Sequence, residues 1–127
     1  MTSKIFVMGA ALTLFGSLAA PGIADAGGTL VNTTVTIRTA NGDFWGYVES
    51  PQPRNCAKGR KVILFKQTGR KQNPQNDRRV ASDTASKNGD RFMWSTGNTG
   101  LSGKFYAKVA RTDQCKPDAS KTVKSDR

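Results

Sequence analysis

The chain has 127 residues, of which 20 are Lys or Arg and 9 are Asp or Glu, so its formal net charge is +11 at pH 7. It contains two cysteines and no histidine, which excludes Ser-His-Asp and Cys-His catalysis and makes a cysteine metal site a poor fit. The length suits one domain with a small core, and the excess of positive charge favours solubility and attracts polyanions.

Residues 1–26 are predicted to be a helical secretory signal peptide. Lys4 supplies the positive start, an uncharged apolar run extends to Ala20, and Ala24-Asp25-Ala26 has the small-x-small pattern of a cleavage site. A membrane anchor is the alternative, but the apolar run is short for a span of about 20 residues. Cleavage predicts a domain that starts near Gly27, is secreted and has no stable membrane insertion.

The rest of the chain shows no sustained helical period. Short runs of β-branched and aromatic residues alternate with turn signals, which is typical of an all-β protein. The first two strands are expected over 30–39 and 43–49, joined by Asn41-Gly42, because both residues accept the positive φ angles of a two-residue hairpin. Gly46 indicates a bulge or a close approach of another backbone segment. Residues 50–60 are expected to form a loop.

The second half continues the same pattern. It predicts strands over 61–67, 79–85, 90–95 and 104–111, an exposed, mobile loop over 68–77 and a Gly-rich loop over 96–103. Asn88-Gly89 is a second hairpin signal, and the strand after it places Phe92 and Trp94 together on the core side. Residues 116–127 are predicted to be a polar, frayed tail. The elements predict an antiparallel β-sandwich of about seven strands over residues 27–115.

Cys56 and Cys115 are predicted to form a disulfide, because an exported chain meets an oxidising environment and two cysteines allow one pairing. The bridge would close a loop of about 60 residues and contribute on the order of 4 kcal/mol. It would connect the loop before the third strand with the exit of the last strand.

The glycines and apolar residues of these strands resemble a family motif. The pieces are Gly46-x-Val48, Gly59-Arg60-x-Val62-x-Leu64, Ser82-Asp83-Thr84 followed by Gly89-Asp90-x-Phe92-x-Trp94, and Gly103-Lys104-Phe105-Tyr106-Ala107-x-Val109. This order resembles the transthyretin-like (prealbumin-like) domains, also called carboxypeptidase regulatory-like domains, and the small secreted members of actinobacterial type. The resemblance covers about residues 44 to 110. It implies an Ig-like or prealbumin-like sandwich that serves as an accessory, spacer or adhesive module.

Two carboxylates near the second hairpin are the candidates for chemistry. Asp83 and Asp90 could act as an acid–base pair, or bind Ca²⁺ together with Asn88, but their spacing does not match a dedicated calcium loop. The resemblance implies another role for Asp83, which is to accept hydrogen bonds from backbone amides around the turn. We therefore predict that the protein is not an enzyme and has no catalytic residue, metal or cofactor.

Aromatic and basic residues are the candidates for a ligand surface. Trp45 and Tyr47 share one face of their strand, and the sequence does not decide whether that face is buried. Basic residues gather before the third strand and around the loop that follows it. The predicted surface comprises Trp45, Tyr47, Arg54, Lys58, Arg60, Lys61, Arg78 and Arg79. The alternative is that the scattered charges only solvate the domain and protect its sheet edges.

These features predict a secreted, monomeric, non-enzymatic module with a structural or binding role in the extracellular or cell-envelope space. Its partner would be an envelope polymer or another extracellular protein. The alternative is electrostatic binding of polyanions through the basic surface, with an anionic cell-wall polymer, a glycan or nucleic acid as the ligand.

Overall fold

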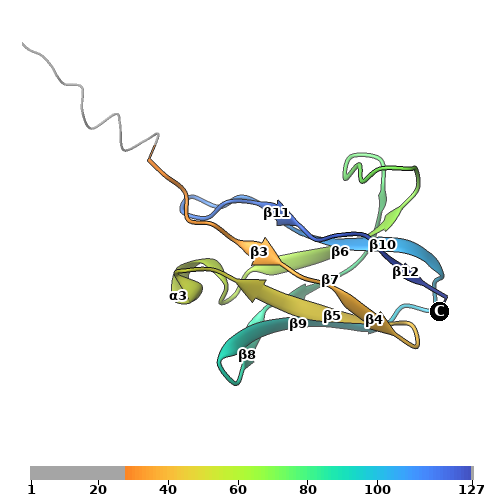
Figure 1. Cartoon of the computed structure of the whole chain (residues 1–127), viewed down its shortest axis with the longest axis horizontal. Helices are drawn as coiled ribbons and strands as arrows, with labels where there is room; N and C mark the ends of the chain where they lie inside the picture. Colours follow the sequence, from red (N-terminus) through yellow and green to blue (C-terminus); the bar gives the residue numbers. More distant parts are fainter. Residues whose placement is uncertain (1–27, 127) are drawn as a thin grey trace, which may run out of the picture.

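Residues 28–126 are described by the computed structural model, and they form two antiparallel β-sheets packed face to face (Figure 1). The all-β sandwich expected from the sequence is confirmed. The predicted signal peptide, residues 1–26, lies outside the described residues.

Sheet I contains β3 (Thr34–Val35), β4 (Arg38–Ala40), β5 (Asp43–Glu49), β8 (Ser86–Asn88) and β9 (Arg91–Asn98). β5 and β9 form its centre, β3 and β4 both pair with β5, and β8 pairs with β9. The first expected strand is therefore divided in two. β9 runs on to Asn98, into the segment that the sequence predicts to be a Gly-rich loop.

Sheet II contains β6 (Lys61–Gln67), β7 (Arg78–Thr84), β10 (Gly103–Val109), β11 (Asp118–Ala119) and β12 (Val123–Ser125). β6 and β10 form its centre, and β11 and β12 both pair with the outer side of β10. The prediction of a frayed tail is wrong for the described residues after Cys115, because Ser120 and Ser125 are buried there. These two strands are too short and too polar to produce a strand pattern in the sequence.

A short helix, α3 (Pro53–Cys56), lies in the segment predicted to be a loop. Pro53 stands in its first turn, where a missing backbone N–H costs no helical hydrogen bond. The predicted disulfide between Cys56 and Cys115 is confirmed, with the two Cα atoms 5.5 Å apart. The bridge attaches α3 to the segment that follows β10.

The two hairpin signals have different outcomes. Asn41 and Gly42 have φ angles of 54° and 87° and join β4 to β5 in a two-residue turn, as predicted. In the second hairpin, Asn88 pairs with Arg91, so the turn consists of Gly89 and Asp90. This turn lies one residue later than predicted, because the positive φ, 65°, occurs at Gly89.

The core lies between the sheets and is built from alternate residues of their strands. Its larger buried members include Phe44 and Val48 of β5, Val62 and Leu64 of β6, Trp94 of β9, and Phe105 and Val109 of β10. The prediction that Phe92 and Trp94 share the core side is confirmed, with Trp94 fully buried and Phe92 packed at the margin.

Gly46 lies opposite the break between β3 and β4. A Cβ at this position would overlap the carbonyl oxygen of Thr36 and would lie 2.8 Å from Nε1 of Trp94. The same carbonyl accepts a hydrogen bond of 2.9 Å from the Trp94 indole N–H. The close backbone approach predicted from Gly46 is confirmed, and its cause is the bond between Thr36 and Trp94.

Replacing Gly46 by Ala is expected to lower the free energy of unfolding by about 3 kcal/mol, because the methyl group must displace a backbone carbonyl. Gly69→Ala is the control, because a Cβ there meets nothing within 4 Å. It is expected to change stability by less than about 0.5 kcal/mol. Urea unfolding followed by tryptophan fluorescence measures the stability of both variants. Equal stability of the two would contradict the close approach of the Thr36 carbonyl to Gly46.

The loop between β6 and β7 is anchored by the buried carboxylate of Asp77. This group accepts hydrogen bonds from the backbone N–H of Thr68 (3.0 Å) and of Asn73 (2.7 Å), and from the hydroxyls of Thr68 (3.0 Å) and Tyr106 (2.6 Å). Tyr106 is fully buried on the side of β10 opposite the core and stacks on Phe65. The prediction of an exposed, mobile loop is therefore wrong for Asp77.

These bonds make stability depend on pH. Burial raises the pKa of Asp77, but the hydrogen bonds from Tyr106, Thr68 and Asn73 outweigh it and lower the pKa from 3.8 to about 2. Because the pKa is lower in the folded protein, this stabilisation is present above about pH 4 and is lost as the pH falls towards 2.

Asp77→Asn is expected to lower the free energy of unfolding at pH 7 by about 1–3 kcal/mol, and by less at pH 2. Urea denaturation of both proteins at pH 7, 4 and 2 measures the difference. A difference that stays constant over this range would contradict the role of the ionised carboxylate.

Candidate functional site

The outer face of sheet I carries two partly exposed aromatic rings. Along β5, Phe44, Gly46 and Val48 are buried, whereas Trp45 and Tyr47 point away from the core and are partly exposed. The sequence left open which face of β5 is buried, and the core contacts of Phe44 and Val48 decide it. Both rings are therefore partly accessible from the outer face of sheet I.

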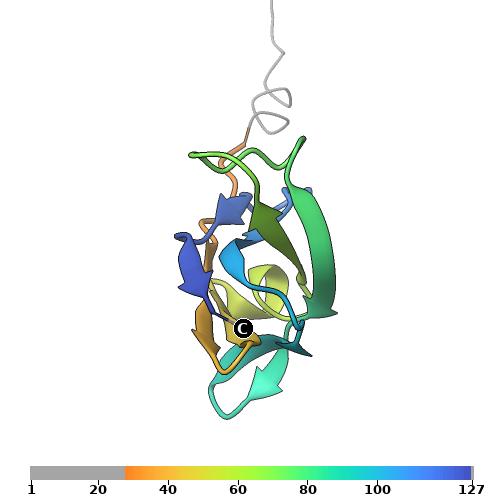
Figure 2. The same ribbon diagram turned by 90° about the vertical axis from the view of Figure 1, so that its right-hand side faces the viewer.

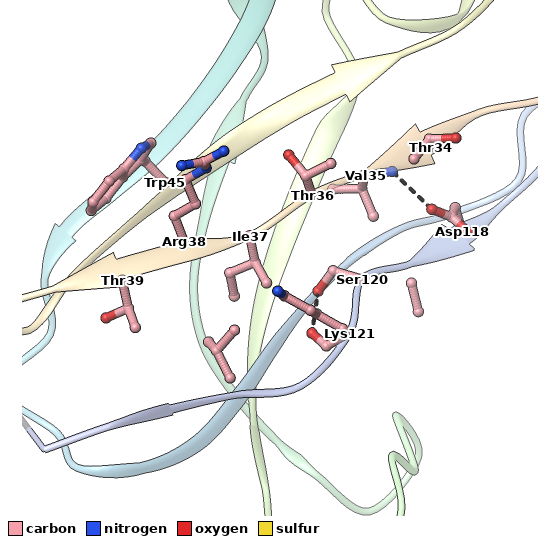
Figure 3. A pocket seen from close by; sticks show the side chains of 12 residues that line it. Thr34, Val35, Thr36, Ile37, Arg38, Thr39, Trp45, Asp118, Ser120 and Lys121 are labelled. Atoms are coloured by element: carbon pink, nitrogen blue, oxygen red, sulfur yellow. Dashed lines mark hydrogen bonds between the residues drawn. The ribbon is translucent and has the colours of Figure 1, made fainter.

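A cation lies beside each ring. The guanidinium of Arg91 lies 3.5 Å from the centroid of the Tyr47 ring and donates a 2.6 Å hydrogen bond to Glu49. Arg38 is the direct cross-strand neighbour of Trp45, and their side chains lie on the same face of the sheet (Figure 3). We call Arg38, Trp45, Tyr47 and Arg91 the aromatic platform. It combines flat apolar surface with positive charge.

A groove of about 880 Å³ runs beside the aromatic platform (Figure 3). It lies between the β3–β4 side of sheet I and the β11–β12 side of sheet II, which are neighbours in the fold (Figure 2). Arg38 and Trp45 line the groove as well as the platform, and Lys121 lines it from sheet II. Near one end, the carboxylate of Asp118 accepts a 2.8 Å hydrogen bond from the backbone N–H of Val35. Platform and groove thus form one continuous surface.

Unpaired positive charge dominates this surface. Among residues 28–126 there is one ion pair, between Arg91 and Glu49, with both side chains about half exposed. Arg38 and Lys121 therefore have no carboxylate partner in the described part of the chain. When exposed cations of this kind bind a polyanion, they displace the counterions condensed on it, which favours association at low salt.

The remaining predicted surface residues lie elsewhere. Lys61 begins β6, and Arg78 and Arg79 begin β7, so all three belong to sheet II. Arg54 on α3 and Lys58 after it line a separate depression at the α3 end of the molecule. The structure therefore does not unite the predicted set with Trp45 and Tyr47 in one surface.

Arg60, a predicted surface residue, is buried. Its guanidinium donates to the hydroxyl of Thr33 (3.1 Å) and to the carbonyl oxygens of Cys56 (2.9 Å), Ala110 (2.7 Å) and Lys116 (3.2 Å). Burial without a carboxylate partner lowers the pKa of Arg60. The prediction of a ligand-binding role is wrong for this residue, because its donors are used to connect four segments around the disulfide.

Arg60→Gln is expected to lower the free energy of unfolding by about 3 kcal/mol, since buried carbonyl groups lose their donor. The control, Lys61→Gln, removes the same charge from an exposed neighbour and is expected to have an effect below about 0.5 kcal/mol. Chemical denaturation measures both. Equal losses would mean that net charge, rather than the buried hydrogen bonds, determines the effect.

The carboxylates near the second hairpin have separate positions. The carboxylate of Asp83 accepts a 2.7 Å hydrogen bond from the backbone N–H of Ser95, which links β7 of sheet II to β9 of sheet I. Asp90 is exposed in the turn. The amide bound by Asp83 thus belongs to the opposite sheet and not to the turn itself. Within residues 28–126, no group of three or more His, Cys, Asp or Glu residues could hold a metal ion.

The prediction of the ligand surface omitted two residues of the platform. Arg38 follows from the two-residue turn at Asn41-Gly42, because such a turn places Arg38 opposite Trp45. No local feature of the sequence predicts the position of Arg91. Its place beside Tyr47 depends on the pairing of β5 with β9, which contains a register shift between Phe44 and Trp45.

Comparison with known proteins finds no protein-family model and no curated sequence that matches the chain. In residues 28–126, none of the helical structure has the length and apolar character needed to cross a membrane.

Proposed function

We propose that the protein is a secreted, non-enzymatic binding module whose ligand is an anionic polysaccharide of the extracellular or cell-envelope space. The confirmed disulfide is consistent with an oxidising environment outside the cytoplasm. The signal-like sequence of residues 1–26 supports export. Monomeric action of the module agrees with a high net charge, which keeps small domains apart in solution.

The aromatic platform is the observation that carries this proposal. Trp45 and Tyr47 are partly exposed on the same face of one strand and offer flat surface to sugar rings. Arg38 lies opposite Trp45, and the guanidinium of Arg91 covers one face of the Tyr47 ring. The spacing of alternate strand residues is about 7 Å, so an extended polymer can contact both rings at once. The adjoining groove offers a path for the rest of the ligand.

The side chains that could act as nucleophile, acid or base favour binding over catalysis. The chain has no histidine, and the two cysteines are joined to each other. Asp77, Asp83 and Asp118 are engaged in hydrogen bonds with the fold, and Asp77 is held ionised. A general acid or base needs a pKa near the working pH, which Asp77 does not have.

The resemblance to transthyretin-like accessory domains agrees with a binding or spacer role. That resemblance depends on turn glycines and strand residues, which are requirements of the architecture rather than of an activity. A purely structural role in the envelope is the alternative, and it requires no ligand at the platform.

Binding of heparin, used as an anionic polysaccharide probe, is expected to weaken by at least about tenfold between 50 and 200 mM NaCl. Trp45→Ala is expected to weaken binding by at least about fivefold through the loss of ring stacking. Isothermal titration calorimetry gives both values. Dextran serves as the neutral polymer and single-stranded DNA as the nucleic acid.

Two arginine variants separate the platform from general charge. Arg38→Gln is expected to weaken heparin binding more than Arg79→Gln, although both remove one exposed positive charge. Equal effects of the two variants, or no binding at low salt, would overturn the proposal. Tighter binding of DNA than of heparin would instead assign the platform to nucleic acid.

A further inference from the structure

A second concave site lies at the α3 end of the molecule, and its lining shares no residue with the aromatic platform. It has a volume of about 610 Å³ and is lined by Arg54, Lys58, Gly59, Ala85, Ser86, Lys87 and Phe92. These residues come from α3, the turn after it, the link between β7 and β8, β8 itself and β9. α3 and β8 lie at the same end of the sandwich (Figure 1). None of them belongs to the platform.

Positive charge converges on this site from two elements and the turn between α3 and β6. Arg54 lies on α3, Lys58 follows that helix, and Lys87 lies on β8. The lining contains no Asp or Glu, and none of the three cations forms an ion pair with the described residues. Charges of one sign around a concavity raise the local concentration of the opposite charge.

The backbone under these cations is held in place. The N–H of Lys58 donates to the carbonyl of Pro53 at 2.8 Å, and the N–H of Gly59 donates to the carbonyl of Ala85 at 2.9 Å. α3 is fixed by the Cys56–Cys115 disulfide. Lys87 is paired with Phe92 in the β8–β9 ladder. The backbone that carries these three cations is therefore held in place before a ligand binds, and binding has to order only their side chains.

The lining also offers an apolar surface. Phe92 is partly exposed while it packs against the core, and Ala85 beside it is buried. Ser86 is exposed and supplies a hydroxyl. A bare inorganic anion would use the cations alone, whereas a sugar ring with an anionic group would use the cations, the hydroxyl and the aromatic ring.

We propose that this depression binds a sugar unit that carries a phosphate, sulfate or carboxylate group. Arg54, Lys58 and Lys87 hold the anionic group, and Phe92 contacts the sugar ring. This site does not depend on ligand binding at the aromatic platform, and it can be occupied by a free sugar or by one unit of a polymer.

The test is an NMR titration of ¹⁵N-labelled protein with glucose 6-phosphate, inorganic phosphate and glucose at low salt. Glucose 6-phosphate is expected to give saturable shifts of the amides of Lys58, Gly59 and Lys87. Phosphate is expected to bind at least about threefold more weakly, because it lacks the ring. Glucose at the same concentrations is expected to leave these amides unchanged.

Matched variants define the cations that matter. Lys58→Gln/Lys87→Gln is expected to weaken binding of glucose 6-phosphate by about tenfold. Lys104→Gln/Lys108→Gln removes the same charge from β10 and is expected to change the affinity by less than about twofold. Equal losses in both pairs, or shifts confined to other regions, would overturn the site.

Two further variants complete the test. Phe92→Leu keeps an apolar side chain in the core, and it is expected to reduce the affinity for glucose 6-phosphate to that for phosphate. Full affinity in this variant overturns the contact with the sugar ring. Trp45→Ala is expected to bind glucose 6-phosphate like the unchanged protein, so failure of the platform and failure of this site are distinguishable.

Discussion

The hydrogen bond from the Trp94 indole to the Thr36 carbonyl determines how sheet I is built. It draws the chain between β3 and β4 over Gly46, so the backbone crosses a position where any side chain would collide with it. Thr36 remains attached to β5, because its backbone N–H donates to the carbonyl of Tyr47 and its hydroxyl accepts from the Tyr47 N–H. Gly46 lies between Trp45 and Tyr47, so the packing that fills the core on one side of β5 also sets the positions of the two rings on the other side. The proposed polysaccharide surface thus depends on a contact that lies beneath it.

The other end of the sandwich is held by a covalent bond and a buried cation that act on the same segments. The disulfide joins α3 to the chain after β10, and Arg60 donates to the carbonyl of Cys56 and to carbonyls on both sides of Cys115. A guanidinium suits this position because it presents five donors in a planar arrangement and remains charged without a carboxylate. The disulfide and the hydrogen bonds of Arg60 together hold the backbone that carries Arg54 and Lys58. In this region Arg60 therefore stabilises the fold, whereas Arg54 and Lys58 form no ion pair with the described residues and can bind an anion.

Local sequence patterns predicted those parts of the fold that depend on interactions between residues close together in the chain. The bounds of β5 and β6 and the turn at Asn41-Gly42 follow from strand alternation and from residues that accept positive φ, and the disulfide had one possible pairing. β11 and β12 could not be predicted, because short polar segments form strands only when a neighbour such as β10 supplies the hydrogen bonds. The burial of Arg60 had no local signal either, since its acceptors come from segments far apart in the chain. In the platform, the position of Arg38 opposite Trp45 could be predicted from the turn at Asn41-Gly42. The position of Arg91 depends on the register between β5 and β9, which are far apart in the sequence.

The bond between Asp118 and the backbone of Val35 has a consequence for behaviour at high concentration. Val35 lies on an outer strand of sheet I, and a free N–H there is the kind of group that recruits a strand from another molecule. The carboxylate occupies this donor and places a negative charge where an incoming backbone carbonyl would have to lie. Growth of the sheet from one molecule to the next is thereby opposed at β3. A domain rich in strands can then reach a high concentration without polymerising along this edge.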